Sequence, residues 1–551
     1  MFAQRRPYSL RAVAVGLAAA PLLLMTSVAG AAVGDDTTAT YGQFGIRTLG
    51  LKQFGTGSYG EPTFAVAPDG RHLLASTPGC GGVCSWASPD DGKTWSKAAA
   101  TGAGGDSEVD FVPTPDGVVT LSADLALLKV NTSSTQNSYI HTSGDFGQSW
   151  DSSKRTTAGI EQDRQWLAHS TDGLTSYLVY HDFAAEAEVY AKGTYNASTK
   201  TFDWPQQDAG HPVNSADQLA PPNVGIAAKP GDPVSVLDQG VNTYSGPMLV
   251  APKPQGGDDL YVVYSISNLE SNSTTSGGGV PPYGGVRSIA VAHSADGGTI
   301  WNNHYAVVAP SGADPSQEES NGTMFPWGFV DQAGTVYVVY DSTHDNKGTD
   351  HYGFYYVYSK DKGSTWSSPV RLDNLPAGQG SVVFNTGAAV TPGVIDVAWL
   401  QKDTGSLSTD TGPAEHWYPW FAQIENADSA APHVVGAQKM TTIRNHNGGV
   451  CIQGILCGIA PGSSDRSLLD FFEMAVNPVT HMAEVAYADN GGQRPGSVAN
   501  NEVVFAQQSL QPTLGPGSQV PEVPSAVLLP IAGLVLLGLA ARFRRGAALP
   551  G

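Results

Sequence analysis

Acidic residues recur at the starts of predicted strands in this chain, and their side chains are suited to acid–base chemistry. When seven segments of similar pattern are aligned, these positions hold Glu61, Glu108 with Asp110, Asp163 with Arg164, and Asp470 with Glu473, while Arg466 precedes Asp470. Crowded carboxylates raise one another's pKa, so one can keep a proton while another is ionised. Cleavage of a glycosidic bond needs that division between an acid and a base or nucleophile. We therefore predict a catalytic group around one mouth of a central channel, formed by Glu61, Asp163, Arg164, Arg466 and Asp470.

Two alternatives stay open for these residues. A polar residue at the start of an inner strand can simply bond a neighbouring strand or a buried water. A cation held by the carboxylates is another alternative, and oxygen ligands favour Ca²⁺ over a transition metal. We expect no zinc site and no obligatory cofactor.

Aromatic residues at predicted strand ends are the candidates for stacking on a sugar ring. Trp417 and Trp420 lie in the stretch HWYPW and are assigned to substrate binding if they are exposed, or to packing if they are buried. Trp166 and Trp327 are assigned to packing between repeated units.

The elements that position these residues come from an internal repeat. Each copy has a polar start, a strand, a Gly or Asp turn, and a stronger strand. The seven copies begin at Glu61, Glu108, Asp163, Gly246, Gly322, Val382 and Leu468. With a further hairpin each copy makes a four-stranded blade, and a ring of blades leaves only short edges. We predict an all-β propeller of seven blades, with six as the alternative because the copy at Val382 is the faintest. A strand at Gly45 to Leu51 or at Glu502 to Gln508 closes the ring.

One short motif, S-x-D-x-G-x-[TSI]-W, occurs four times, and we call its copies the four box segments. They run from Ser88 to Trp95, Ser143 to Trp150, Ser294 to Trp301, and Ser359 to Trp366. An Asp side chain can cap the backbone amides of a tight turn, and Gly supplies the positive φ. The predicted structural residues are Asp90, Trp95, Asp145, Trp150, Asp296, Trp301, Asp361 and Trp366.

The box segments resemble the Asp-box, or bacterial neuraminidase repeat, of the sialidase-like superfamily. The resemblance covers residues 44–508 and implies a β-propeller in which the boxes lie away from the active face. Sialidases of that superfamily hold a sugar carboxylate with three arginines, the first usually in an R-I-P sequence. They also use a Tyr–Glu pair and an Asp. Here the nearest match, Gly45-Ile46-Arg47, lacks the Pro, which argues against sialidase chemistry. Related propellers cut plant β-glucans with two Asp residues.

The two ends of the chain predict export and anchoring. Residues 1–32 place Arg5, Arg6 and Arg11 before an apolar run that ends in small residues, as in a signal peptide. Residues 509–524 form a Pro- and Gly-rich spacer, 525–541 an apolar transmembrane anchor, and 542–551 a basic cytoplasmic tail. This end resembles the three-part sorting tails, of PEP type, found on bacterial surface proteins. We expect a bacterial protein at the extracellular face of the membrane, or a secreted one if the tail is cleaved.

Four cysteines occur as two close pairs, Cys80 with Cys84 and Cys451 with Cys457. In an exported protein this spacing predicts two local disulfides. The net charge of −21 argues against nucleic acid as a partner. The expected partner is extracellular carbohydrate or a surface protein.

Two functions remain open at this point. One is a surface-anchored, sialidase-like glycoside hydrolase acting on extracellular glycans. The other is a non-catalytic propeller that binds glycan or protein at the cell surface. The missing sialidase signatures favour the second and the shared fold favours the first, although a shared fold is weak evidence for chemistry.

Overall fold

The structure is a computed structural model, and it is built from β-sheets. It describes residues 44–48, 60–79, 82–98, 105–130, 133–151, 154–155, 162–182, 187–204, 211–213, 229–234, 243–267, 286–308, 319–323, 325–345, 351–375, 379–402, 415–452, 465–490 and 502–508. Within these ranges the chain forms strands and no helix, in seven antiparallel sheets. The described part accordingly holds no helix that could cross a membrane. The predicted signal peptide, spacer, anchor and tail lie outside the described residues.

Each sheet is one blade, numbered in chain order. Blade 1 contains β2 (Thr63–Val66), β3 (Leu73–Pro78), β4 (Val83–Ser88) and β5 (Ser96–Lys97). Blade 2 contains β6 (Ser107–Thr114), β7 (Gly117–Val130), β8 (Ser133–Ser143) and β9 (Lys154–Arg155). Blade 3 contains β10 (Gln162–His169), β11 (Thr175–Asp182), β12 (Ala187–Asn196), β13 (Thr201–Asp203) and β14 (His211–Pro212). Blade 4 contains β15 (Thr243–Pro252), β16 (Asp258–Ser267), β17 (Val286–Ser294) and β18 (Asn302–Val308).

The other three blades follow the same plan. Blade 5 contains β19 (Trp327–Val330), β20 (Val336–Ser342), β21 (Gly353–Ser359) and β22 (Val370–Arg371). Blade 6 contains β23 (Ser381–Thr391), β24 (Val394–Lys402), β25 (His416–Glu425), β26 (His433–Lys439) and β27 (His446–Asn447). Blade 7 contains β28 (Glu473–Val476), β29 (Ala483–Asp489), β30 (Glu502–Gln508) and β1 (Phe44–Thr48).

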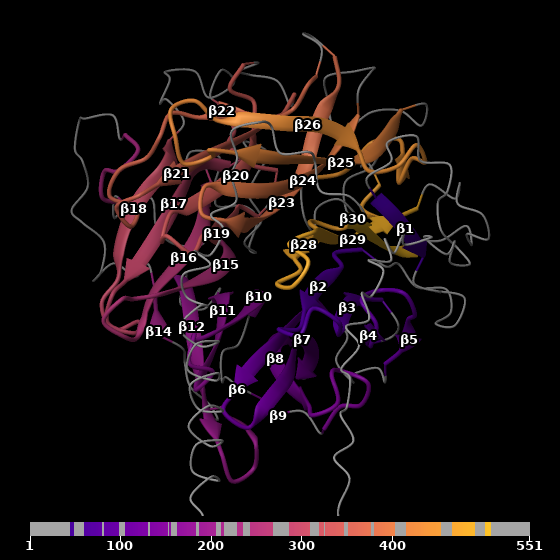
Figure 1. Ribbon diagram of the computed structural model, residues 1–551, viewed down its shortest axis with the longest axis vertical. Helices are drawn as coiled ribbons and strands as arrows, with labels where there is room; N and C mark the ends of the chain where they lie inside the picture. Colours follow the sequence, from indigo (N-terminus) through magenta and orange to yellow (C-terminus); the bar gives the residue numbers. More distant parts are fainter. Residues whose placement is uncertain are drawn as a thin grey trace, which may run out of the picture.

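The blades form a closed ring. The first strand of each blade contacts the first strand of the next, in the order β2, β6, β10, β15, β19, β23, β28 and back to β2 (Figure 1). The protein is therefore a seven-bladed β-propeller. The predicted architecture is confirmed, and the alternative of six blades is wrong, because the faint repeat at Val382 does form blade 6.

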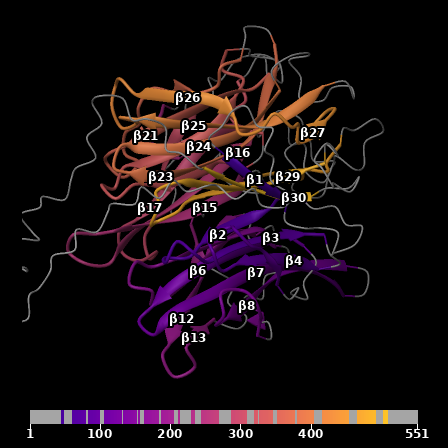
Figure 2. The same cartoon turned by 45° about the vertical axis from the view of Figure 1, so that its right-hand side comes forward.

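The ring is closed by a strand from each end of the described chain. β1 pairs antiparallel with β30, with Ile46 opposite Ala506, so blade 7 takes its outermost strand from the beginning of the chain. Figure 2 shows β1 beside β30 and β29. The two strands proposed as alternatives for closure thus belong to the same blade.

The second strand of a blade appears in the sequence as a short apolar run because it is buried on both faces. β3, β20 and β29 are buried at every position. Neighbouring blades cover both faces of each sheet, so these strands lack the polar alternation of a half-exposed strand. The core is therefore spread over the interfaces between blades.

The four box segments are the turns between the third and fourth strands of blades 1, 2, 4 and 5. In blade 1, Asp90 Oδ1 accepts a hydrogen bond from the backbone N–H of Thr94 at 2.7 Å. Gly92 donates its N–H to Ser88 Oγ at 2.9 Å and has a φ of 70°. Trp95 Nε1 donates to the carbonyl of Gly92 at 3.1 Å. This confirms that these Asp, Gly and Trp residues build a turn.

Each box segment also contacts the preceding blade. The residue after the Asp makes the contact in three of the boxes. Asp91 accepts a hydrogen bond from Gln507, Phe146 stacks on His72 at 3.7 Å, and Lys362 pairs with Asp259 at 2.7 Å. In blade 4 the carbonyl of Gly297 accepts a hydrogen bond from Lys192 of blade 3. The boxes therefore join blades as well as closing hairpins.

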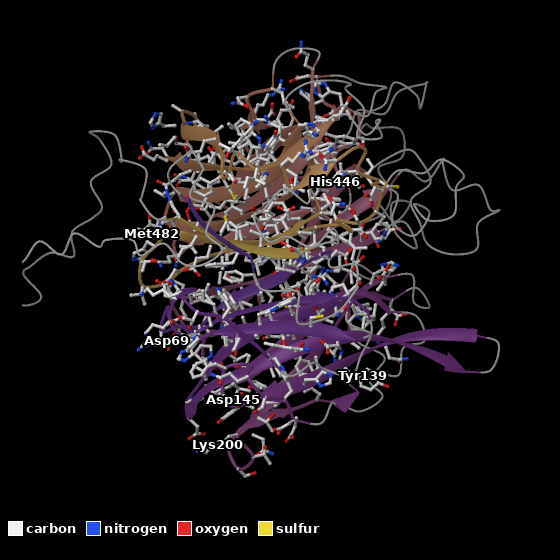
Figure 3. The ribbon with its side chains drawn as sticks, turned by 90° about the vertical axis from the view of Figure 1, so that its right-hand side faces the viewer. Asp69, Tyr139, Asp145, Lys200, His446 and Met482 are labelled. Atoms are coloured by element: carbon white, nitrogen blue, oxygen red, sulfur yellow. The ribbon has the colours of Figure 1, made fainter. Side chains whose placement is uncertain are left out.

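Figure 3 shows the ring from the side and separates its two faces. Asp69 and Met482, in the turns after β2 and β28, lie on one side, and Asp145 of a box segment lies there too. His446 lies on the other side. Because Asp69 follows the end of β2, the beginnings of the inner strands face the side of His446. We call this the entry side.

Two of the four cysteines lie among the described residues. Cys84 and Cys451 are each disulfide-bonded. Cys80 and Cys457 lie outside the described residues, so the two pairings stay predictions.

Candidate functional site

The segments before β2 and β28 are clamped together at the entry side. The N–H of Glu61 donates to the carbonyl of Leu468 at 3.2 Å. A Cβ on Gly60 would lie 2.6 Å from Cγ of Leu469, so only Gly fits there. Glu61 and Leu469 have φ values of 49° and 58°, a conformation that costs energy for residues with a side chain. This packing fixes the Glu61 side chain relative to blade 7.

Glu61 and Asp470 form a buried pair of carboxyl groups beside Arg466. Nη2 of Arg466 donates a hydrogen bond to Oδ2 of Asp470. Burial, followed by the charges of Asp106 and Asp470, raises the pKa of Glu61 well above its usual value. Burial also raises the pKa of Asp470, but Arg466 and a hydrogen bond from Glu61 oppose the rise. Glu61 is therefore the member of the pair that keeps the proton.

Asp163 adds a third carboxyl group from blade 3. Burial, and then the charge of Asp106, raises the pKa of Asp163 to about 7. Its Oδ1 accepts the N–H of Arg164 at 3.0 Å. Asp163 and Asp106 are partly exposed, whereas Glu61 and Asp470 are buried. The side chain of Arg466 is 24% exposed. Solvent thus reaches this group of carboxyl side chains at Asp163, Asp106 and Arg466.

Arg164 lies next to these carboxyls but points into the protein. Its side chain is only 2% exposed. Nη1 donates to the carbonyl of Ser107 at 3.0 Å and Nη2 to Oε2 of Glu108 at 3.0 Å. The guanidinium lies between the rings of Trp166 and Phe471, 3.9 Å from each centroid. This corrects the prediction that Arg164 contacts a substrate, because protein groups already occupy both terminal nitrogens.

A second carboxyl pair surrounds Arg164. Burial and the charge of Glu473 raise the pKa of Glu108 well above its usual value, and burial raises that of Glu473 to about 7. Oε1 of Glu473 lies 3.9 Å from Arg164 Nη2, and its Oε2 accepts the N–H of Phe64 at 2.7 Å. These contacts tie blades 1, 2, 3 and 7 together.

Aromatic side chains from blades that are not neighbours meet at the centre of the ring. Trp166 of blade 3 contacts Trp327 of blade 5 at 5.4 Å and Phe471, next to blade 7, at 5.2 Å. Phe325 contacts Trp166 at 5.9 Å. Residues of blades 3, 5 and 7 can touch only across the centre. This confirms the packing role predicted for Trp166 and Trp327.

The structure contradicts the substrate-binding role of Trp417 and Trp420. Trp417 is 0% exposed, and its Nε1 donates to the carbonyl of Gly448 at 2.9 Å. Trp420 is 7% exposed and stacks on Trp399 at 6.1 Å. Both lie on β25, whose two faces are covered, so the two tryptophans of the HWYPW stretch contribute to the packed core.

The structure brings together the predicted residues Glu61, Asp163, Arg466 and Asp470, whose catalytic roles stay predictions. Two further residues of the group were missed by sequence reasoning. Asp106 precedes β6 and raises the pKa of Glu61 and Asp163. Tyr244, near the start of β15, lies near Asp163 and Asp470, whose charges add to burial in raising its pKa. Asp106 lies two residues before Glu108, the position aligned with Glu61, and an acidic residue just before a predicted strand was a signal that could have found it. Tyr244 had none, because its repeat was aligned from Gly246.

The described residues contain no group of three or more His, Cys, Asp or Glu side chains arranged to hold a metal ion. The carboxyl group at the entry side instead pairs its members with each other and with Arg466. The Ca²⁺ alternative therefore gains no support from the described ranges.

The chain resembles several solved structures at low identity. A protein of unknown function from Dyadobacter fermentans is 12% identical, with a TM-score of 0.37, over 82% of this chain and 95% of that one. An α-L-arabinofuranosidase from Fusarium graminearum is 14% identical, with a TM-score of 0.36, over 62% and 88%. An ulvan lyase is 10% identical, with a TM-score of 0.41, over 82% and 94%.

The sequence matches no protein-family model and no curated protein. Similarity to the solved structures is too low to carry chemistry from them to this chain.

Proposed function

We propose that the protein is an exported glycoside hydrolase of the Asp-box, sialidase-like type, which acts on extracellular glycans and is anchored by residues 525–541. One observation carries the proposal. Asp163, whose pKa is raised to about 7, shares the entry side with Asp470, a carboxylate paired with Arg466. An acid that keeps its proton near neutral pH, beside a charged carboxylate, is the division of roles that glycoside hydrolysis uses.

The roles follow from exposure and charge. Asp163 is partly exposed and is the proton donor to the leaving group. Asp470 is the base or nucleophile, and Arg466 opposes the rise of its pKa. Glu61 donates a hydrogen bond to Asp470 and so restrains it.

The charges favour a neutral sugar over an acidic one. Glu108 and Glu473 flank Arg164, and among the described side chains Arg466 is the cation paired with a member of the entry-side carboxyl group. Arg371 and Arg444 bond elsewhere, to Asp373 and His416. A carboxylate-bearing sugar would meet Asp106 and Asp470 with too little positive charge to offset them. Sialic acid is therefore not the expected substrate.

Hydrolysis of a fluorogenic panel of neutral and acidic glycosides by the full chain tests the proposal. We expect turnover of neutral glycosides, with activity falling above about pH 7 as Asp163 loses its proton. Asp163→Asn and Asp470→Asn should each lower kcat by about 10²-fold or more.

Asp396→Asn is the matched control. Asp396 is buried on β24, has its pKa raised to about 7 by burial, and bonds Gln423. This variant should keep full activity. Loss of turnover in Asp396→Asn equal to that in Asp163→Asn would contradict the assigned roles.

A second function is supported by the Glu108–Glu473 pair. That pair is buried around Arg164 and joins blades, so paired carboxyls in this protein also serve as packing. On this alternative the entry-side group does the same, and the propeller binds glycan or protein without catalysis. No turnover across the panel by a folded chain would favour this alternative.

A further inference from the structure

Three polar side chains lie in line across blade 3. Asp163 on β10 is paired with His181 on β11, and His181 is paired with Glu188 on β12. Directly paired residues of antiparallel strands project to the same face of the sheet. The line therefore runs from the partly exposed Asp163 to the interior of the blade.

His181 and Glu188 form a fully buried pair. Nδ1 of His181 lies 3.0 Å from Oε1 of Glu188, and the two side chains are 1% and 0% exposed. A buried carboxyl group is costly without a hydrogen-bonding partner. The imidazole ring also stacks on Tyr244 of blade 4, with centroids 6.1 Å apart and planes 27° apart. The ring of His181 is thus fixed from two sides.

We propose that His181, fixed by Glu188 and Tyr244, is a positioning residue that stands behind Asp163 and sets the charge of its carboxyl group. The effect on catalysis rests on the function proposed above. The effect on Asp163 itself does not, because it depends only on the position of His181 opposite Asp163.

Among the groups that face Asp163, His181 opposes the neighbouring carboxyl groups. Asp106 and Asp470 act to raise the pKa of Asp163, in addition to burial, and the N–H of Arg164 and the charge of His181 act to lower it. Arg466 also interacts with Asp163, and Tyr244 lies close to it. His181 is the ionisable group directly opposite Asp163 on the neighbouring strand of the same blade. Without it, Asp163 would face the other carboxyls with less positive charge nearby.

Titration of Asp163 in the full chain tests this inference without any substrate. The chain is labelled with ¹³C at the aspartate side-chain carboxyls, and the signal absent from Asp163→Asn identifies Asp163. We expect the titration midpoint to rise by about one pH unit in His181→Gln.

A second variant covers the case in which His181→Gln fails to fold. His181→Phe with Glu188→Leu removes both polar partners together and keeps a ring against Tyr244, a replacement that buried pairs often tolerate. Its midpoint should rise by the same amount. His293→Gln is the matched control, because His293 pairs with Asp259 at 2.8 Å toward the other end of blade 4. The His293→Gln variant should leave the titration midpoint of Asp163 unchanged.

The outcomes separate this inference from the proposed function. An unchanged midpoint in the folded double variant overturns the role of His181, whatever the enzyme assay shows. If the midpoint rises and the chain also turns over a glycoside, the limb of the rate profile above pH 7 should move upward by the same shift. If the midpoint rises without turnover, the inference stands and the hydrolase proposal fails.

Discussion

At the scale of single residues, Arg164 has a different role from the one that its position in the repeat predicted. Its place before an inner strand suggested a substrate contact, yet its guanidinium is enclosed by Glu108, Glu473 and two aromatic rings. Its backbone φ of 39° lies in a bulge of β10, where the register shifts between Asp163 and Trp166. The bulge turns the Arg164 side chain inward.

We expect Arg164→Ala to lower the free energy of unfolding by about 3–5 kcal/mol, because it leaves Glu108 and Glu473 without their cation. Denaturant unfolding monitored by tryptophan fluorescence measures the change. Lys360→Ala is the control, since Lys360 is 56% exposed and pairs with Asp428, whose side chain is 28% exposed. It should cost less than about 1 kcal/mol. Equal losses in the two variants would contradict the buried-cation role.

Residue types in the repeat predicted the carboxyl group but not its internal pairing. Glu61, Asp163 and Asp470 could be located because the aligned repeats place each of them near the start of an inner strand. Which of them faces solvent depends on side-chain rotation and on bulges such as that at Arg164. The sequence carries no periodic signal for either rotation or bulges. The same lack of signal explains why packing and substrate binding both stayed open for Trp417 and Trp420.

At the scale of elements, the box segments act between blades. Gly147 illustrates the constraint, with a φ of 82° and a position where a Cβ would lie 2.8 Å from Leu74 of blade 1. The turn itself was predictable from Asp, Gly and Trp at fixed spacing. The contact with the preceding blade was not, because it joins residues far apart in the chain.

We expect Gly147→Ala to lower the free energy of unfolding by about 2–3 kcal/mol, through backbone strain and the clash with Leu74. Gly144→Ala, in the same box, is the matched control. A Cβ at Gly144 meets nothing within 4 Å, and its φ is not positive. That variant should change stability by less than about 0.5 kcal/mol. Calorimetry on both variants checks the prediction, which fails if the two variants have the same melting temperature.

At the scale of the whole molecule, buried acids give stability an unusual pH dependence. Burial raises the pKa of Asp163 and Glu473 to about 7 and that of Glu484 to about 8. Such groups keep a proton in the folded state at pH values where the unfolded chain has lost it. Raising the pH above the unfolded pKa, about 4, therefore favours unfolding until the folded pKa is passed. The box aspartates Asp90 and Asp361 have lowered pKa values, since hydrogen bonds outweigh partial burial. Their charged forms stabilise the fold, and this contribution is lost only in stronger acid, when they become protonated.

We expect the melting temperature to be highest near pH 5 and to fall steadily toward pH 8, by an amount that corresponds to a few kcal/mol. Scanning calorimetry of the full chain at several pH values measures it. Glu484→Gln, which keeps the shape of a group bonded to Asn477 and Gln507, should flatten the slope. A melting temperature that rises from pH 5 to pH 8 would rule out this account.

The seven-bladed ring itself was predictable, because seven copies of one pattern need the same neighbours on both sides. The partner of the last blade was harder to assign, since either end strand could fill the place. Both are used: β30 is the third strand of blade 7 and β1 is its fourth.

The pairing of β1 with β30 has a consequence for synthesis. β1 is among the first described residues to leave the ribosome, yet its hydrogen-bonding partner is the last strand to be made. Blade 7 therefore cannot be completed until translation has passed residue 508, however early the other hairpins form. A chain cut short before β30 exposes the open edges of β1 and β29, and unpaired strand edges of this kind recruit other chains into aggregates.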